Sequence, residues 1–299
     1  MHDQAPVARR QFLAHSIAAG AAVSMAGRLS AAPAERSEPR LKKAVKFDMV
    51  KSGSSIEEKF ALLKSLGFQG VELNSPSNID RREAVTAARK TGIDIHGVID
   101  SIQWTVRLSD PDPAVRARGL EGLKTALRDA KFYGATTVLL VPGKVADPEK
   151  ENYEQVYERS QAQIRKAIPL AEDVGVKIAV EVVWNDFISK PEEFAAYIDA
   201  FNNPIVGGYF DISNMLKYGV ASSTWIRKLG KRMLKFDFKG YSRKRGWVSI
   251  GEGDENWPEV LRALDDVGYR GWATAEVSGG GRKELADVAE RMNRCLALS

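Results

Sequence analysis

Four acidic residues stand at the ends of four successive runs of apolar and β-branched residues. They are Glu181 in IAVEVVW, Asp211 in VGGYFDISN, Asp237 in LKFDFKG and Glu276 in WATAEVSG. If these runs are neighbouring strands of one parallel sheet, their carboxyl ends lie about 5 Å apart per strand and the four carboxylates converge. Buried carboxylates require a cation or a shared proton. The pattern therefore predicts the site of a metal-dependent enzyme.

The rest of the chain supplies a regular alternation of elements that could position these acids. Strands are expected at 44–50, 69–73, 93–98, 136–142, 177–183, 205–211, 233–239 and 271–277, and helices near 56–66, 80–91, 112–134, 152–174, 191–202, 222–230, 256–267 and 282–297. Several helical segments end in Gly just before a strand, as in LGFQGVEL and VGVKIAVE, which is typical of αβ loops. Repeated βα units without a dinucleotide-binding glycine motif favour an α/β fold of the (β/α)8 TIM-barrel type, with an open doubly wound sheet as the alternative.

Side-chain alternation predicts which residues enter the barrel. Alternate residues of a barrel strand face the interior, and apolar ones should face the helices. On this basis the interior residues are expected to be Asp94, His96, Val98, Glu181, Lys235, Asp237 and Lys239, and the outward ones Ile93, Ile95, Ile99, Ile178, Val180, Val182, Leu234, Phe236 and Phe238. The alternation and the acidic cluster agree.

Composition limits the kind of site. The chain has 299 residues, of which 44% are hydrophobic and 28% charged, as in ordinary soluble proteins. Cys295 is its one cysteine, which excludes an internal disulfide and a cysteine-based zinc site. Of three histidines, His2 and His15 lie near the N-terminus, so a site built on several histidines is excluded as well. The net charge of +5 comes without a nucleic-acid-binding motif, so no nucleic-acid partner is expected.

The first residues read as a targeting segment. Arg9 and Arg10 precede a weakly apolar stretch rich in Ala and Gly, with Ala32 and Ala34 as small residues for cleavage. This resembles a twin-arginine export signal, with a disordered basic N-terminus as the alternative. The expected organisation is a signal peptide at 1–34, a linker at 35–43 and one barrel at 44–299. The protein is then exported to the periplasm or another extracytoplasmic space, without a stable membrane anchor.

From about residue 44 onward the chain resembles the xylose isomerase-like TIM-barrel family of sugar and sugar-phosphate isomerases and epimerases. The resemblance rests on SLGFQGVEL, EVVWN, YFDISN, LKFDFKG and GEGDENWPEVLRALDDVGYRGWATAEV. It implies one divalent metal held by Glu181, Asp211, Asp237 and Glu276. It further implies that Glu181 and Glu276 transfer protons, with Lys239, which matches the family's lysine, as a third catalytic residue.

Three positions depart from the family pattern. Asp237 stands where the His-x-Lys-Asp motif has its histidine, and Gly240 replaces the final aspartate of that motif. Asn214 replaces a histidine often found three residues after the metal-binding aspartate. An all-oxygen set of ligands favours Mg²⁺ or Mn²⁺ over Zn²⁺.

Further residues are expected to contact a sugar. The six expected to bind substrate are Glu72, His96, Trp104, Trp184, Asn185 and Asn214. Aromatic faces suit the C–H surfaces of sugar rings. For Glu72 a structural salt bridge, and for His96 a role in the core, are the alternatives. Basic residues at 243–245 could bind phosphate, although exposed basic loops are usually only solvated.

These features predict a divalent-metal-dependent isomerase or epimerase of an unphosphorylated sugar or keto-sugar. A carboxylate would remove the proton next to a carbonyl, giving an enediolate that is protonated again elsewhere. A lyase or hydratase acting on a keto-sugar or glycoside uses the same first step and is the closest alternative. A carbohydrate-binding barrel with weakened catalysis is another, whereas a related DNA-repair endonuclease would need more histidines. The sequence leaves open the sugar, the metal and whether the chain forms a homo-oligomer.

Overall fold

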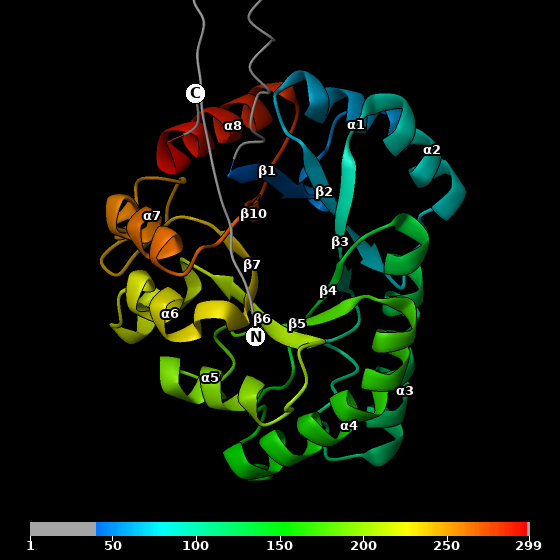
Figure 1. Cartoon of the computed structure of the whole chain (residues 1–299), viewed down its shortest axis with the longest axis vertical. Coiled ribbons are helices and arrows are strands. Elements are labelled where there is room, and N and C mark those ends of the chain that lie inside the picture. Colours follow the sequence, from blue (N-terminus) through cyan, green and yellow to red (C-terminus); the bar gives the residue numbers. More distant parts are fainter. Residues whose placement is uncertain (1–39, 298–299) are drawn as a thin grey trace, which may run out of the picture. The chain divides into compact units, whose positions relative to one another are not determined.

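A closed barrel of parallel strands forms the centre of the computed structural model, which describes residues 40–297. Within these residues eight strands follow the order β1-β10-β7-β6-β5-β4-β3-β2, and helices surround them (Figure 1). The barrel strands are β1 (Leu41–Lys46), β2 (Gly70–Ser75), β3 (Asp94–Asp100), β4 (Thr137–Leu140), β5 (Lys177–Glu181), β6 (Val206–Asp211), β7 (Met233–Phe238) and β10 (Gly271–Ala275). The predicted (β/α)8 barrel is confirmed. The expected signal peptide lies outside the described residues.

The helices begin and end at capping residues that the sequence supplies. They are α1 (Ile56–Ser65), α2 (Arg81–Thr91), α3 (Pro113–Tyr133), α4 (Tyr153–Val174), α5 (Pro191–Asp199), α6 (Ser222–Leu229), α7 (Trp257–Asp266) and α8 (Arg282–Leu296). The side chain of Asp112 accepts the amide of Ala114 at the start of α3. Gly134 and Gly175 end α3 and α4 with φ of 79° and 68°, a left-handed conformation that glycine adopts at little cost.

Two segments differ from the expected elements. The first strand was expected at 44–50, but β1 ends at Lys46 and the 3-10 turn η1 (Phe47–Met49) follows. After β7 a short antiparallel hairpin forms from β8 (Tyr241–Ser242) and β9 (Gly246–Trp247), which the sequence did not predict. Two further 3-10 turns, η2 (Asn214–Tyr218) and η3 (Gly230–Arg232), flank α6.

Bulges in two strands change the inward and outward alternation of side chains that the sequence predicted. Val71 pairs with Ile95 while Glu72 pairs with Gly97, so His96 is an extra residue in β3. Beyond it Val98 packs toward the helices and Ile99 toward the interior, the reverse of the prediction. A second bulge lies in β7, where Leu234 is the extra residue between Met233 and Lys235. Leu234 was expected outward and instead packs against the small cluster inside the barrel.

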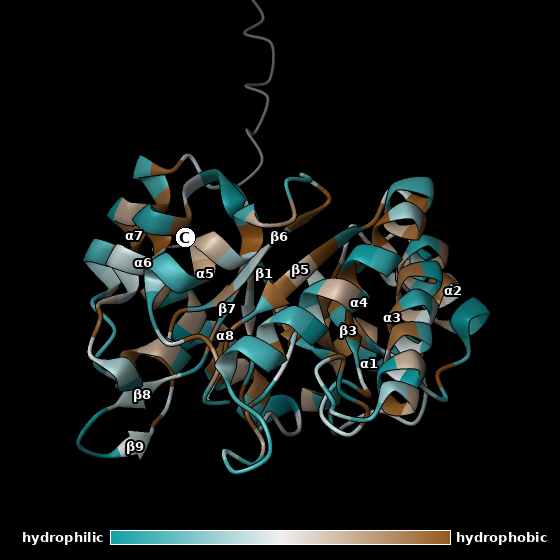
Figure 2. Cartoon of the chain, turned by 90° about the horizontal axis from the view of Figure 1, so that it is seen from below, coloured by the Kyte–Doolittle hydropathy of each residue, from teal (hydrophilic) through white to brown (hydrophobic). Residues whose placement is uncertain are grey.

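The core has an apolar shell and a largely polar centre. One large hydrophobic cluster fills the space between strands and helices, and hydrophilic residues cover the outer faces of the helices (Figure 2). Inside the barrel the apolar cluster contains only Leu139, Ala179 and Tyr209, with Ile99 and Leu234 packed against it. Charged and polar side chains from β1, β2, β3, β7 and β10 occupy the remaining interior. Within residues 40–297, no helix has the length and apolar character needed to cross a membrane.

Candidate active site at the carboxyl ends of the strands

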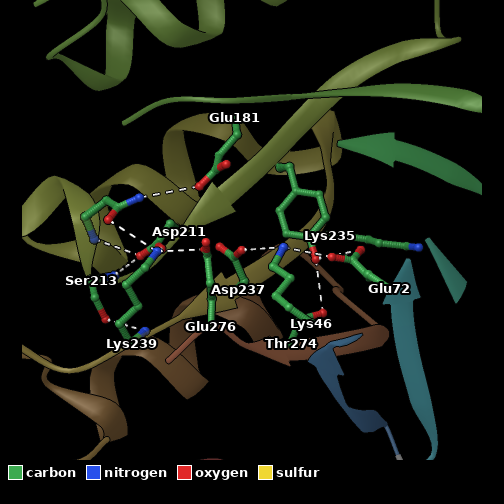
Figure 3. Close-up of polar contacts among 12 residues, drawn as sticks. Lys46, Glu72, Glu181, Asp211, Ser213, Lys235, Asp237, Lys239, Thr274 and Glu276 are labelled. Carbon is green, nitrogen blue, oxygen red and sulfur yellow. Dashed lines mark hydrogen bonds and ion pairs between the residues drawn. The ribbon is translucent and has the colours of Figure 1, made fainter. Parts of the chain in front are cut away.

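Four carboxylates meet where the strands end. Glu181 is the last residue of β5, Asp211 the last of β6, Asp237 lies one residue before the end of β7, and Glu276 follows β10 directly. One ligand atom from each lies within 4.8 Å of all the others (Figure 3). The convergence predicted from the sequence is therefore present, because consecutive parallel strands deliver their last residues to one edge of the barrel.

Two lysine side chains flank this carboxylate cluster on opposite sides (Figure 3). Lys239 Nζ lies 2.5 Å from Asp211 Oδ2 and 2.8 Å from Glu276 Oε2. Lys46 Nζ lies 2.9 Å from Asp237 Oδ2 and 2.8 Å from Oε2 of Glu72. Each ammonium group thus bridges two acids, and Lys239 lies directly beside the carboxylate cluster.

The environment separates the pKa values of the two glutamates. Burial, reinforced by the charges of Asp237 and Glu276, raises the pKa of Glu181 well above its ordinary range. Burial also acts on Glu276, but Lys239 and Lys46 outweigh it and lower the pKa of Glu276 to about 2. One carboxyl group therefore favours the protonated form and the other the ionised form, which is the pattern of an acid and base pair.

Asp237 is the least satisfied member of the carboxylate cluster. The residue is fully buried, and neither Oδ1 nor Oδ2 accepts a hydrogen bond of good geometry from any described residue. Burial and the charges of Asp211 and Glu276 raise its pKa well above the ordinary range, although Lys46 opposes this. With Lys46 as an ion-pair partner but no well-formed hydrogen bond, this buried carboxylate is expected to bind a further cation.

The carboxylate cluster fits a divalent metal ion by its chemistry and size. All four side chains offer oxygen, which Mg²⁺ and Mn²⁺ prefer. Metal–oxygen distances of about 2.1 Å place opposite ligands about 4.2 Å apart, close to the 4.8 Å limit of the carboxylate cluster. Glu181, Asp211, Asp237 and Glu276 are thus the residues that would hold the ion.

A cavity of about 610 Å³ opens in front of the carboxylate cluster. Glu181 and Glu276 line it, together with Lys46 and Lys239, whereas Asp211 and Asp237 lie behind them. This volume falls within the range of small-molecule sites. Of the four carboxylates in the cluster, the two glutamates are therefore the ones that a bound molecule would meet.

Three of the expected substrate contacts lie at this cavity. Trp104, Trp184 and Asn214 line it. Asn214 Nδ2 donates a hydrogen bond to Glu181 Oε1 at 3.4 Å. The backbone carbonyl of Asn214 accepts a hydrogen bond from Trp184 Nε1 at 2.5 Å. Asn214 therefore connects the aromatic wall of the cavity to a carboxylate at its floor.

The other three expected contacts need correction, because Glu72, His96 and Asn185 do not line the cavity. Glu72 is fully buried in the middle of β2, where it binds Lys46 and accepts Tyr209 OH at 3.0 Å. The bulge in β3 places His96 inside the barrel, stacked on Trp272 with ring centroids 4.3 Å apart. Asn185 is buried beyond the end of β5 and donates to the Gly143 carbonyl at 2.5 Å. All three serve the framework of the barrel.

Some cavity residues were missed by the sequence analysis. Lys46 was expected early in a longer first strand, whereas it ends β1 and reaches Asp237. Asp100 lines the cavity from the end of β3, and burial raises its pKa to about 7. Trp247 belongs to the unpredicted hairpin. The only sequence signal for it is a pair of aromatic residues, Tyr241 and Trp247, on either side of a polar turn that ends in glycine.

Comparison with known proteins agrees with this architecture. Residues 60–296 match the family model described as xylose isomerase-like TIM barrel. L-ribulose-5-phosphate 3-epimerase of Escherichia coli is 28% identical over 169 residues, which cover 53% of this chain and 59% of that protein. The chain thus aligns with rather more than half the length of this curated relative.

Solved structures extend the similarity of the fold. D-allulose 3-epimerase from Methylomonas sp., in complex with D-allulose, superposes with a TM-score of 0.73 at 18% identity, covering 86% of this chain and 96% of that one. The IOLI protein with a bound zinc atom gives a TM-score of 0.72 at 15% identity, covering 86% and 98%. Identities this low establish the fold alone. With the family match over most of its length, the chain belongs to the xylose isomerase-like TIM barrel family.

Proposed function

We propose that the protein is a divalent-metal-dependent sugar isomerase or epimerase that acts on an unphosphorylated sugar or keto-sugar. The observation that carries this proposal is the convergence of four strand-end carboxylates within 4.8 Å of one another. Two of them, Glu181 and Glu276, line the cavity. The similarity to sugar epimerases supports the same class of reaction.

The two glutamates would carry the proton. Ionised Glu276 would take the proton from the carbon next to the substrate carbonyl, and the C–H electron pair would become the double bond of an enediolate. Protonated Glu181 would return a proton to the opposite face of that carbon or to the neighbouring carbon. The first outcome is an epimerisation. The second is an isomerisation, in which the hydroxyl group on the first carbon also passes its proton to the former carbonyl oxygen and becomes the new carbonyl.

The surrounding groups would bind and orient the substrate. Lys239 lies between Asp211 and Glu276 and faces the cavity, so its ammonium group can stabilise negative charge that develops on a substrate oxygen. Trp104 and Trp184 provide apolar ring surface, and Asn214 provides an amide beside Glu181. A divalent cation bound by the carboxylate cluster would supply Lewis-acid polarisation of the carbonyl.

The metal is proposed to be Mn²⁺ or Mg²⁺, because the carboxylate cluster contains only oxygen ligands. A structure of the same fold holds zinc, so a transition metal is compatible with the architecture. The basic residues at 243–245 form the turn of the β8–β9 hairpin and do not line the cavity. These three residues are therefore not placed to bind a phosphate group in the cavity.

Elemental analysis followed by solvent exchange tests the proposal. The purified protein should contain about one divalent ion per chain, and a panel of ketoses and aldoses in heavy water should include one that gains deuterium next to its carbonyl. Glu181→Gln and Glu276→Gln should abolish this exchange while the circular dichroism spectrum stays unchanged. Exchange within a few-fold of the wild type in either variant would contradict proton transfer through that residue. Product analysis by NMR separates epimerisation from β-elimination.

Export to an extracytoplasmic space is part of the same proposal. It is supported by the twin-arginine-like segment around Arg9 and Arg10.

A further inference from the structure

A second hollow adjoins the cavity of the candidate active site. It measures about 1090 Å³ and lies between the segment that follows β7 and helix α8. The two hollows share the five residues Lys239, Trp247, Glu276, Val277 and Ser278. A ligand seated on the carboxylate cluster could therefore continue into the second hollow without leaving the protein surface.

Trp247 lies where the two hollows meet, and neighbouring aromatic residues hold its ring in place. The β8–β9 hairpin holds its backbone opposite Tyr241, and the Tyr241 ring packs at 63° with centroids 5.1 Å apart. On one face it stacks on Trp184 at 4.8 Å and 18°. Trp247 nevertheless remains 49% exposed. An aromatic ring fixed by its neighbours but left half open is suited to bind another planar or apolar surface at little entropic cost.

The charges around the second hollow favour a neutral occupant. Its lining contains three cationic and three anionic side chains: Lys239, Lys283, Arg291, Glu276, Glu284 and Asp287. Arg291 is already bound to Asp287 at 2.7 Å and to Glu252 at 2.8 Å. An anion at Arg291 or Lys239 would have to compete with existing ion pairs, whereas a neutral polar molecule would not.

The remaining lining matches the two-sided character of a sugar ring. Val248, Val277 and Val288 offer apolar surface, and the exposed hydroxyl groups of Ser249 and Ser278 make no hydrogen bond with another described residue. Sugar binding combines such apolar faces with hydroxyl partners at the edge. The three valines supply the apolar surface, and the two serines supply the hydroxyl partners.

We infer that the second hollow is a subsite for an additional sugar ring, with Trp247 as its stacking platform, so that the substrate class is a neutral glycoside of at least two units. This inference rests on the proposed function, because it places the first ring at the carboxylate cluster. The reacting carbon belongs to that first ring, and the second ring contributes binding alone.

The test compares paired sugars on the full-length, Mn²⁺-loaded protein by isothermal titration calorimetry. Cellobiose, maltose and lactose are each measured against glucose or galactose. At least one disaccharide should bind about tenfold more tightly than its monosaccharide, since one stacked ring contributes on the order of a factor of ten. Trp247→Ala should reduce that ratio to about one and Trp247→Phe should retain part of it. Phe132→Ala, which removes another exposed aromatic ring 46% accessible on α3, should leave the ratio unchanged.

The outcomes separate this inference from the proposed function. If no disaccharide in the panel exceeds its monosaccharide, or if Trp247→Ala keeps the ratio, the subsite does not exist. If the ratio behaves as expected but no sugar exchanges a proton with heavy water, the subsite stands and the proposed chemistry is wrong. Saturation-transfer NMR adds a direct check, because protons of both rings should receive saturation from the protein.

Discussion

Lys46 and Asp237 form an ion pair inside the barrel, with Nζ 2.9 Å from Oδ2 and both side chains buried. The same ammonium group binds Glu72 at 2.8 Å and lies 4.9 Å from the centre of the Tyr209 ring. Although burial alone would lower the pKa of Lys46, Glu72 and the other anionic groups raise it well above its usual value. Lys46 therefore remains charged, and it neutralises both Glu72 on β2 and Asp237 on β7.

Removing this ammonium should strongly destabilise the fold. Lys46→Met leaves Glu72 and Asp237 without their cation, and breaking a buried pair in this way costs about 3 to 5 kcal/mol. Urea unfolding followed by circular dichroism measures the loss in the free energy of unfolding. Lys90→Met is the matched control, because Lys90 pairs with Glu57 at 2.7 Å on the surface and should cost less than about 1 kcal/mol. Equal losses in both variants would contradict the role assigned to Lys46.

Metal binding should survive the return of a histidine at position 237. Asp237→His keeps a ligand atom in the carboxylate cluster and removes one negative charge, so the metal content should stay near that of the wild type. Asp237→Leu removes the ligand atom and should lower metal affinity by about tenfold or more. Elemental analysis after dialysis against graded chelator measures both. Complete loss of metal in Asp237→His would show that Asp237 does not belong to the set of ligands.

Stability should fall as Asp100 ionises. Burial raises the pKa of Asp100 from 3.8 to about 7. The folded state therefore binds a proton more tightly than the unfolded state, so the stabilising contribution is complete below pH 4 and disappears as the pH rises toward 7. A shift of this size corresponds to at most about 4 kcal/mol.

Asp100→Asn should abolish this component of the pH dependence. The variant should be more stable than the wild type at pH 8 and closer to it at pH 5, as urea titrations at the two values can show. Asp94→Asn, an exposed position at the start of the same strand, serves as the control. A pH profile unchanged by Asp100→Asn would exclude this carboxyl group as its source.

Gly240 should tolerate no side chain. A Cβ atom at this position would lie 2.4 Å from the Ser249 carbonyl oxygen and 2.6 Å from that of Val248, and both atoms belong to the backbone that returns from the hairpin. Gly240→Ala should cost about 2 kcal/mol in the free energy of unfolding. Gly208→Ala should cost less, because its nearest neighbours, at 3.2 Å, are the ends of the Ile198 and Phe194 side chains. Thermal unfolding of both variants makes the comparison.

The N-terminal segment should direct export. Replacing Arg9 and Arg10 together by lysine keeps the charge but removes the paired guanidinium groups that characterise a twin-arginine signal. The protein should then remain in the cytoplasm, whereas the wild type should reach the periplasm and lose about its first 34 residues. Cell fractionation followed by N-terminal sequencing tests both statements. Periplasmic protein of unchanged length would contradict cleavage.

The sequence predicted the barrel and the acidic residues because both follow from periodic patterns. Alternating strand and helix signals recur along the chain, and strand-end acids must meet once the strands are parallel neighbours. Bulges break this logic: the extra residue His96 inverts the side-chain alternation beyond it in β3, and in β7 the extra residue Leu234 itself turns toward the barrel interior. The roles of Lys46 and Trp247 depend on contacts between distant segments, which a single sequence does not encode locally.

The position of Gly240 constrains the path of the hairpin that carries Trp247. An aspartate there would collide with the backbone leaving the hairpin, so the hairpin that presents Trp247 and the acidic end of the motif are mutually exclusive. Only a residue without a Cβ atom lets the backbone that leaves the hairpin pass this close to the end of β7. Where Trp247 is presented over the cavity therefore depends on a side chain that position 240 lacks.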